Sequence, residues 1–410
     1  MVKGRKRIIA DLAIMGGRKK YDSPLLLGIP NITSQNKFHE MVDDIFQKQW
    51  LTNNGQYVRH FEQMIKDYLN VKNVIAVNNG TVALEIAIRS LCLSGEIIVP
   101  SYTFVATPHS ILWSGAKPTF CDIDSTTYNI DVNKVESLLN ETTKGIVAVD
   151  VYGRPSEKDK LESLAKDHGL SLIFDAAHSF GNSFHRKMIG GFGNAEIFSF
   201  HATKFLNTFE GGAITTNDDL LAQKMRAMRN FGLLDNQSSS YLGINGKMTE
   251  ISAAMGIINL QNIEQIIRVN KANYEIYKKG LKSLQGIKLI EYSNDENCNY
   301  QYIIIEVDPL IAGLSRDELS VVLGAEGVST RKYFWPACHQ MEPYKTMFPG
   351  VGSRLPVTEL VSKKVLALPT GMSVSHEDVL SICDIIEIAL EEPNVIKSRI
   401  QKFMIEGNAK

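Results

Sequence analysis

The stretch LSLIFDAAH, residues 170–178, joins a buried strand to a carboxylate at the strand's end. Four of its first five residues are apolar, and Asp175 follows them, with two alanines and His178 next. Ligands of open α/β sheets bind at the carboxyl ends of the strands, so Asp175 is a candidate ligand-binding residue. A buried carboxylate needs a cationic or hydrogen-bonding partner, since its pKa otherwise rises. An aspartate here can also simply cap the next turn, and His178 can lie in the core or in the site.

Short apolar runs alternate with helical patterns on both sides of this stretch. The expected strands are Val74–Val77, Ile97–Pro100, Pro118–Cys121, Gly145–Val149 and Leu170–Phe174. The expected helices between them are Thr81–Leu91, Val105–Trp113, Val132–Leu139 and Ser156–His168. Strands that alternate with helices of about ten residues predict βαβ units and a mostly parallel sheet. Because the strands are almost entirely apolar, helices should cover both faces of this sheet, which gives three αβα layers.

The remaining segments extend this pattern at both ends. Further strands are expected at Ile197–Phe200, Ala213–Thr216 and Tyr302–Glu306, and a polar loop at Asp235–Ser240. Further helices are expected at Asn36–Gln49, Val58–Leu69, Asp218–Phe231, Thr249–Leu281 (one or two helices), Ser315–Gly324 and His376–Leu390. We therefore predict an α/β protein with a lead-in segment (1–33), a large domain (34–262) and a smaller C-terminal α/β domain (263–410).

The composition is that of an ordinary globular protein. Lys and Arg total 44 against 45 Asp and Glu, so the net charge is -1. Such a balance provides no strong field for nucleic acid or an anionic membrane, and no apolar run approaches the roughly 18 residues of a membrane span. The five cysteines are scattered and form no C-x-x-C, which argues against a disulfide framework or a structural metal site. We expect a cytoplasmic protein with reduced thiols.

The segment Val77–Thr81 (VNNGT) is a candidate phosphate site. A strand ends here, Gly80 makes the turn, and Thr81 opens an amphipathic helix. The free N–H groups of a helix start, with a hydroxyl beside them, suit an anion. The same sequence is also an ordinary turn followed by a helix cap.

The segment Phe198–Lys204 (FSFHATK), followed by FEGG at 209–212, provides a candidate nucleophile. Lys204 lies among Phe200, Phe205 and Leu206, and apolar surroundings lower the pKa of a lysine until its amine becomes reactive. A lone lysine after a strand is more often a solvated surface residue.

The order of these three segments favours pyridoxal 5'-phosphate (PLP) as cofactor. PLP requires a phosphate anchor, an acid facing its ring nitrogen and a lysine for a Schiff base, and the chain offers them in that order. Motifs of competing chemistries are absent, since no P-loop, dinucleotide fingerprint, G-x-S-x-G or H-E-x-x-H occurs.

Beyond these segments, the chain resembles the sugar-aminotransferase branch of fold-type I PLP enzymes, the DegT/DnrJ/StrS family, from about Leu27 to Leu390. The motifs that carry the resemblance are NNGTVAL (78–84), PSYTFVAT (100–107), FCDID (120–124), DAAHS (175–179), FSFHATK (198–204), EGGA (210–213) and GINGKMTE (243–250).

The resemblance implies a role for each matching residue. Lys204 would be the Schiff-base lysine and proton shuttle, Asp175 would pair with the pyridine nitrogen, and His178 would lie beside the ring. The phosphate would be held by Gly80, Thr81 and Ser199, and the aromatic ring of Tyr102 would stack on the cofactor. Asn245 would reach the phosphate of the partner subunit, which implies a homodimer with shared sites.

The same resemblance suggests where the sugar binds. Tyr333, Pro336 and His339 match the family's C-terminal Tyr…Pro…His stretch near the sugar, although they can equally be loop packing. Lys247 stands where the family usually has Arg, so it is a further candidate for substrate binding.

The function implied is transfer of an amino group from L-glutamate to a nucleotide-linked keto sugar. The version of the motifs around Lys204 favours C4 of dTDP-4-keto-6-deoxy-D-glucose, in the synthesis of an amino-deoxysugar for a surface polysaccharide or an antibiotic. Aminotransfer at C3 and a PLP-dependent sugar dehydratase are the alternatives, and the dehydratase is disfavoured because Lys204 is present. A ligand-sensing protein without activity would not need both Asp175 and Lys204. An unrelated α/β protein with chance motifs is disfavoured by the number and order of the matches.

Overall fold

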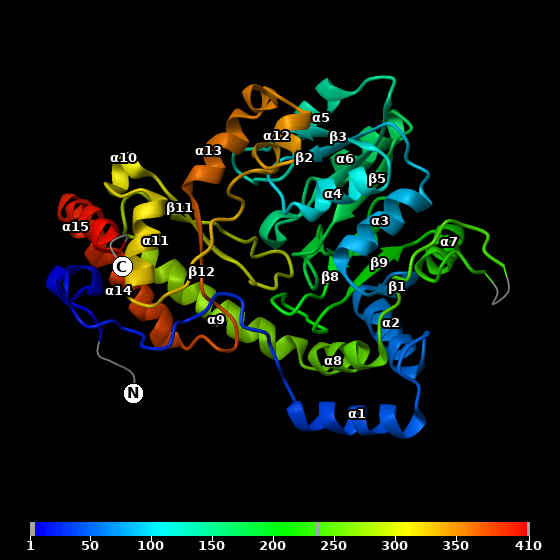
Figure 1. The fold of residues 1–410 in the computed structure, drawn as a ribbon, viewed down its shortest axis with the longest axis horizontal. Coiled ribbons are helices and arrows are strands. Elements are labelled where there is room, and N and C mark those ends of the chain that lie inside the picture. The colour runs from blue at the N-terminus through cyan, green and yellow to red at the C-terminus, as the bar shows by residue number, and fades with distance from the viewer. Residues whose placement is uncertain (1–4, 235–237, 408–410) are drawn as a thin grey trace.

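The computed structural model describes residues 5–234 and 238–407, and a seven-stranded mixed sheet forms the middle layer of its larger part (Figure 1). The strand order is β1-β9-β8-β5-β4-β2-β3. The strands are β1 (Asn73–Val77), β2 (Glu96–Pro100), β3 (Lys117–Cys121), β4 (Thr143–Val149), β5 (Ser171–Asp175), β8 (Ala195–Ser199) and β9 (Gly212–Thr216). The five strands from β3 to β8 pair in parallel, so the predicted mostly parallel sheet is confirmed.

Helices cover both faces of this sheet, as its apolar strands require. One face packs against α3 (Gly80–Ser90), α4 (Ala106–Trp113) and α7 (Asp219–Arg229). The other face packs against α2 (Gln56–Leu69), α5 (Val132–Leu138), α6 (Lys158–Asp167) and α8 (Glu250–Gln261). The helix α1 (Gln35–Lys48) lies beside α8 at the edge of the molecule (Figure 1).

Strand β9 departs from the parallel arrangement because the chain reaches it without a crossover helix. It pairs antiparallel with β8 and with β1. An antiparallel neighbour can be joined by a loop, whereas a parallel one needs a crossover of a dozen or more residues. The loop between β8 and β9 contains Lys204, so this turn brings the lysine back over the carboxyl end of the sheet.

A second, smaller sheet is antiparallel throughout. It consists of β10 (Ile287–Leu289), β11 (Ile303–Val307) and β12 (Val365–Leu368). Around it lie α9 (Ile263–Leu281), α10 (Pro309–Ala312), α11 (Arg316–Ala325), α14 (His376–Glu391) and α15 (Pro393–Gly407). Asn262 separates α8 from α9, so the helical run expected at 249–281 is two helices. Within the described ranges, no helix is long and apolar enough to cross a membrane.

Two segments pack away from their neighbours in sequence (Figure 1). The lead-in, with η1 (Ile9–Asp11) and η2 (Ala13–Met15), joins the core of the smaller sheet through Leu12, Ile14 and Leu25. The segment with η4 (Cys338–Gln340), α12 (Tyr344–Met347), η5 (Val351–Arg354) and α13 (Pro356–Lys364) returns to the large sheet. We keep residue 262 as the proposed boundary between the sheets, with these two segments crossing it.

Three short elements complete the described fold. They are η3 (Val151–Gly153) and a small hairpin of β6 (Ser183–Phe184) and β7 (Lys187–Met188). Of the predicted polar loop Asp235–Ser240, positions 235–237 lie outside the described residues. The rest of that loop returns along the chain, where Ser239 forms a bridge with Leu233.

Candidate active site

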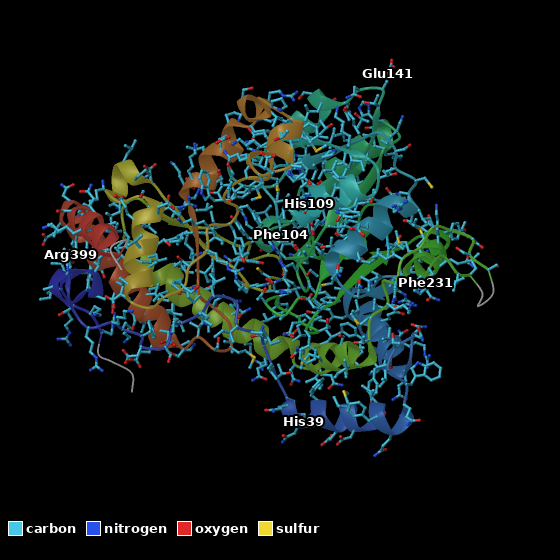
Figure 2. The ribbon with its side chains drawn as sticks, in the orientation of Figure 1. His39, Phe104, His109, Glu141, Phe231 and Arg399 are labelled. Carbon is cyan, nitrogen blue, oxygen red and sulfur yellow. The ribbon has the colours of Figure 1, made fainter. Side chains whose placement is uncertain are left out.

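A cavity of about 270 Å³ opens at the carboxyl edge of the large sheet. It is bounded by the ends of β4, β5 and β8, the start of α3 and the segment 331–334. Seven of the residues predicted from the sequence line it, namely Gly80, Thr81, Asp175, His178, Ser199, Lys204 and Tyr333. In Figure 2, Phe104, another lining residue, lies near the middle of the molecule, between the two sheets. The topology therefore gathers side chains from segments far apart in the sequence in one place.

One corner of the cavity is built by the start of α3. The side chain of Asn79 caps the helix by accepting the N–H of Val82 at 2.8 Å. Gly80 packs directly on Ser199, because a Cβ at position 80 would lie 3.0 Å from the Ser199 Cβ. The helix N-terminus thus meets the hydroxyls of Thr81 and Ser199, which together suit a phosphate group.

Asp175 ends β5 with its carboxylate toward the cavity. The residue is only 6% exposed, and burial raises its pKa. Two hydrogen bonds oppose this effect, since the Thr107 hydroxyl donates to Oδ2 at 2.8 Å and the Ala177 N–H donates to Oδ1 at 3.2 Å. The nearby Lys204 ammonium also favours the ionised form. The site therefore holds a fixed carboxylate that is suited to a cationic partner.

His178 lies behind Asp175 as a neutral imidazole. Burial, and then the proximity of Lys204, lower the pKa of His178 well below its ordinary value. Its Nδ1 accepts the N–H of Tyr152 at 3.2 Å, so the proton of the neutral ring lies on Nε2. The ring of Phe334 stacks on it with a centroid distance of 6.2 Å.

Lys204 extends its amine into the same cavity. Burial lowers the pKa of Lys204 to about 8, although Asp175 acts in the opposite direction. A substantial fraction of the amine is therefore neutral near pH 8 and can act as a nucleophile or base. Its Nζ lies 3.5 Å from the hydroxyl of Tyr302.

The structure corrects the expectation for Tyr102. This residue is fully buried and lies outside the cavity lining, with its hydroxyl bonded to that of Tyr152 (2.6 Å) and to the Tyr333 carbonyl (2.7 Å). Phe104, two residues later and 60% exposed, lines the cavity instead. The chain leaves β2 through buried residues 101–103, and Phe104, just before α4, is the aromatic residue of this turn that lines the cavity.

His339 also lies away from the cavity. Its Nδ1 is 2.7 Å from the Ser101 hydroxyl and its Nε2 is 2.9 Å from Glu359. The ring is 5% exposed, so these contacts fasten the segment after residue 336 to the end of β2. His339 therefore packs against the large sheet and does not line the cavity of its own chain.

Asn245 and Lys247 lie outside the cavity lining of their own chain. The amine of Lys247 donates to Oδ1 of Asn245 at 2.6 Å. Asn245 is exposed, and its backbone forms a bridge with Asn230.

Three residues that the sequence did not single out complete the site. Thr107 bonds to Asp175, Tyr302 contacts Lys204, and Arg331 borders the cavity beside Tyr333. Thr107 belongs to the segment PSYTFVAT, whose position after a strand could have marked it. Tyr302 and Arg331 lie more than ninety residues from the Lys204 loop, and no local pattern points to them.

Comparisons with known proteins identify relatives of this chain. The family model for DegT/DnrJ/EryC1/StrS aminotransferases matches residues 33–387. The dTDP-4-amino-4,6-dideoxy-D-glucose transaminase of Escherichia coli is 34% identical over 356 residues, 86% of this chain and 95% of that protein. The GDP-perosamine synthase of Caulobacter vibrioides is 34% identical over 336 residues, 80% of this chain and 89% of its own.

Solved structures show the same relationship. The structure of DesI in the presence of its TDP-sugar product superposes with a TM-score of 0.90 at 38% identity, covering 96% of this chain and 100% of DesI. The Helicobacter pylori aminotransferase PseC superposes with a TM-score of 0.84 at 26% identity, covering 90% of this chain and 100% of PseC. The fold, the assembled cavity and these matches agree, and the chain belongs to the DegT/DnrJ/EryC1/StrS aminotransferase family.

Proposed function

We propose that this protein is a PLP-dependent aminotransferase that moves the amino group of L-glutamate to C4 of dTDP-4-keto-6-deoxy-D-glucose. The observation that carries the proposal is the meeting, in one cavity, of the α3 N-terminus, the buried Asp175 carboxylate and the Lys204 amine. The preference for a dTDP-linked sugar and for C4 is supported by the transaminases of Escherichia coli and Shigella dysenteriae, 34% and 33% identical to this chain.

The residues present fit PLP at each of its functional groups. Gly80, Thr81 and Ser199 would hold the phosphate at the helix start, and Asp175 would accept a hydrogen bond from the protonated ring nitrogen. Phe104 would cover one face of the ring, and Lys204 would carry the cofactor. When bound, the cofactor supplies an electron sink for the carbon that carries the transferred amine.

The protein's own groups would then control where protons move. In the first half-reaction the neutral amine of Lys204 would take the proton from the α-carbon of the donor and deliver it to the cofactor, and in the second it would move a proton from the cofactor to the acceptor carbon. Asp175 would hold its negative charge toward the ring nitrogen while Thr107 fixes its orientation. His178, which is neutral, would contact the ring without adding charge beside Lys204.

The choice of an acidic donor is supported by Arg331. Its guanidinium borders the cavity next to Tyr333, whose hydroxyl accepts from it at 3.0 Å. No carboxylate of the described residues lies within ion-pair distance of this arginine. A cation at a cavity edge without an acidic partner suits a carboxylate of the substrate, because guanidinium binds carboxylate in two parallel hydrogen bonds.

A homodimer with shared sites is supported by the surface around Asn245 and Lys247. The ring of Phe231, 51% exposed, lies under the Lys247 amine at 4.4 Å. Two further apolar side chains, those of Trp50 and Leu242, are 56% and 72% exposed. Such apolar side chains around polar groups are typical of an interface, and a second copy would bring Asn245 toward a neighbouring cavity.

The experiment is to combine spectroscopy with product analysis. Purified protein with PLP should absorb visible light, lose this absorption when L-glutamate is added, and carry the cofactor on Lys204 after borohydride reduction. Lys204→Ala should show neither the glutamate response nor the trapped adduct. A PLP-saturated protein whose spectrum does not respond to L-glutamate would contradict the proposal.

A panel of keto sugars separates the alternatives. The panel contains dTDP-linked 4-keto and 3-keto 6-deoxy sugars and a GDP-linked 4-keto sugar, the last because GDP-perosamine synthases are among the relatives. Amination at C3, amination of the GDP-linked sugar, or loss of a hydroxyl without amination would each replace the proposed substrate or reaction.

A further inference from the structure

Tyr302 brings a hydroxyl from the smaller sheet to the lysine of the large one. It directly precedes β11, whereas Lys204 follows β8. The hydroxyl lies 3.5 Å from the Lys204 amine, and no other residue of the described ranges makes a hydrogen bond with that amine. This distance is at the long end of hydrogen bonding, and catalytic contacts of this kind commonly shorten when ligands bind.

We infer that Tyr302 is a positioning residue of this aminotransferase, one that holds the amine of Lys204 in place while the amine moves a proton. The inference rests on the proposed function and extends it by assigning the partner of the free lysine.

The tyrosine is held firmly enough for this role. Its ring lies against that of His178 with a centroid distance of 4.5 Å and a tilt of 45°. Its carbonyl accepts the hydroxyl of Tyr292 at 2.7 Å, and the residue is only 8% exposed. The hydroxyl therefore stays beside Lys204 even when the lysine side chain is free to rotate.

The phenol of Tyr302 can form a hydrogen bond with Lys204 in either protonation state of the lysine. Burial, and then the neighbouring Tyr333, raise the pKa of Tyr302 well above its ordinary value, although Arg331 acts in the opposite direction. A phenol that stays protonated donates to the lone pair of a neutral amine and accepts from an ammonium. In each half-reaction Lys204 accepts one proton and gives one up, moving it between the substrate carbon and the cofactor, while Tyr302 keeps its own.

A lysine that is not bonded to the cofactor has a mobile amine, and the contact with Tyr302 restricts it. The side chain of lysine has four rotatable bonds, so an untethered amine spends much of its time away from the reacting carbon. One hydrogen bond from a rigid neighbour restricts that search and keeps the base in reach of the proton. Asp175 and His178 are the other titratable groups near the amine, and neither forms a hydrogen bond with it.

Removing one oxygen atom tests this role in the holoenzyme. Tyr302→Phe keeps the ring contacts with His178 and loses only the hydroxyl. In single turnovers with L-glutamate, we expect the variant to be at least about 10-fold slower and to show a larger isotope effect with α-deuterated glutamate. The half-saturating glutamate concentration should change less than about twofold, because the binding contacts remain.

The matched control is Tyr277→Phe. Tyr277 is a fully buried phenol of α9 whose hydroxyl donates to the Pro369 carbonyl at 2.9 Å, and it does not line the cavity. This variant should keep the wild-type rate and isotope effect. A Tyr302→Phe enzyme that is as fast as the control, with an unchanged isotope effect, would reduce Tyr302 to a packing residue and overturn the inference.

A second readout does not depend on turnover. In the cofactor-free protein, the pH dependence of chemical labelling at Lys204 reports the pKa of its amine, which is about 8 in the wild type. Tyr302→Phe should lower this pKa by about half a unit or more, since hydrogen bonds to the ammonium are stronger than those to the amine. An unchanged pKa would contradict the contact. If the wild type fails to react with L-glutamate, the proposed function falls while this labelling result still stands.

Discussion

The hydroxyl of Thr107 donates a hydrogen bond of 2.8 Å to Oδ2 of Asp175. A residue of α4 thereby fixes a carboxylate at the end of β5, and the hydroxyl of Thr103, 3.0 Å from that of Thr107, extends the chain of contacts. Because Asp175 is buried, these neutral partners determine both its orientation and how readily it stays ionised.

Thr107→Val removes this hydrogen bond while it keeps the shape of the side chain. The pKa of Asp175 should rise further, so the carboxylate should bind the cofactor's ring nitrogen less well. We expect PLP affinity and the rate with L-glutamate to fall by about 10- to 150-fold, the equivalent of one lost hydrogen bond to a charged group. Thr107→Ser is the control and should remain close to the wild type, and equal losses in both variants would point to packing instead.

Arg331→Gln tests the site proposed for the donor carboxylate. We expect the half-saturating concentration of L-glutamate to rise by about 10-fold or more, while the reverse reaction with the amino sugar is much less affected. Lys332→Gln is a matched control one residue away, because Lys332 already pairs with Asp317 at 2.6 Å. Equal effects on both half-reactions would place Arg331 outside the donor site.

The sequence predicted those parts of the fold that repeat a local pattern. All seven strands of the large sheet were expected within two residues of their ends, because each is a short apolar run bounded by turn residues. The edge strands β10 and β12 were missed. Polar residues flank β10 in the sequence, and β12 follows α13 directly, with no turn residue between them. The return of residues 338–364 to the large sheet depends on long-range packing that no local pattern records.

The residues of the candidate site could likewise be predicted only in part. Gly80, Asp175 and Lys204 each lie at or shortly after the carboxyl end of a strand, which is where ligands of open α/β sheets bind. Tyr102 was the wrong choice for the aromatic residue at the cavity. Tyr102 and Phe104 are both aromatic and lie two positions apart, and the turn before α4, which the sequence does not reveal, places Phe104 at the cavity. Tyr302 and Arg331 reach the cavity from the smaller sheet, so their roles depend on how the two sheets meet.

Mixed dimers test the proposed sharing of sites between subunits. Lys204→Ala and Asn245→Ala should each be strongly impaired as homodimers. When the two are denatured together and refolded, some dimers would contain one site with both an intact Lys204 and an intact Asn245. Activity in this mixture above that of either parent is the expected outcome. No recovery, together with proven heterodimers, would place Asn245 outside the partner's site.

Lys158 should be essential for stability because it is the single cation in a buried cluster. Its amine lies 3.0 Å from Asp150 and 2.8 Å from Glu196, and all three side chains are fully buried. Lys158→Met would leave two carboxylates without a counter-charge, which should cost about 3–5 kcal/mol in urea unfolding. Lys160→Met, two residues along α6, removes an exposed pair with Glu157 and should cost less than about 1 kcal/mol. Similar losses in both variants would contradict the cluster's importance.

Lys204 should lower the stability of the cofactor-free protein at neutral pH. Its pKa is about 8 in the folded chain and about 10.4 in an unfolded one, so the unfolded state binds more protons between these values. Stability therefore rises with pH across this window, and the cost of burying the ammonium is fully present below pH 8.

Lys204→Met removes that cost, and we expect the variant to be more stable by about 1–2 kcal/mol at pH 7. The advantage should shrink as the pH rises from 8 toward 10, which urea unfolding at several pH values can measure. Lys160→Met, with an exposed amine, should show no such trend, and a Lys204→Met variant less stable than the wild type at pH 7 would mean that packing of the lysine outweighs its charge.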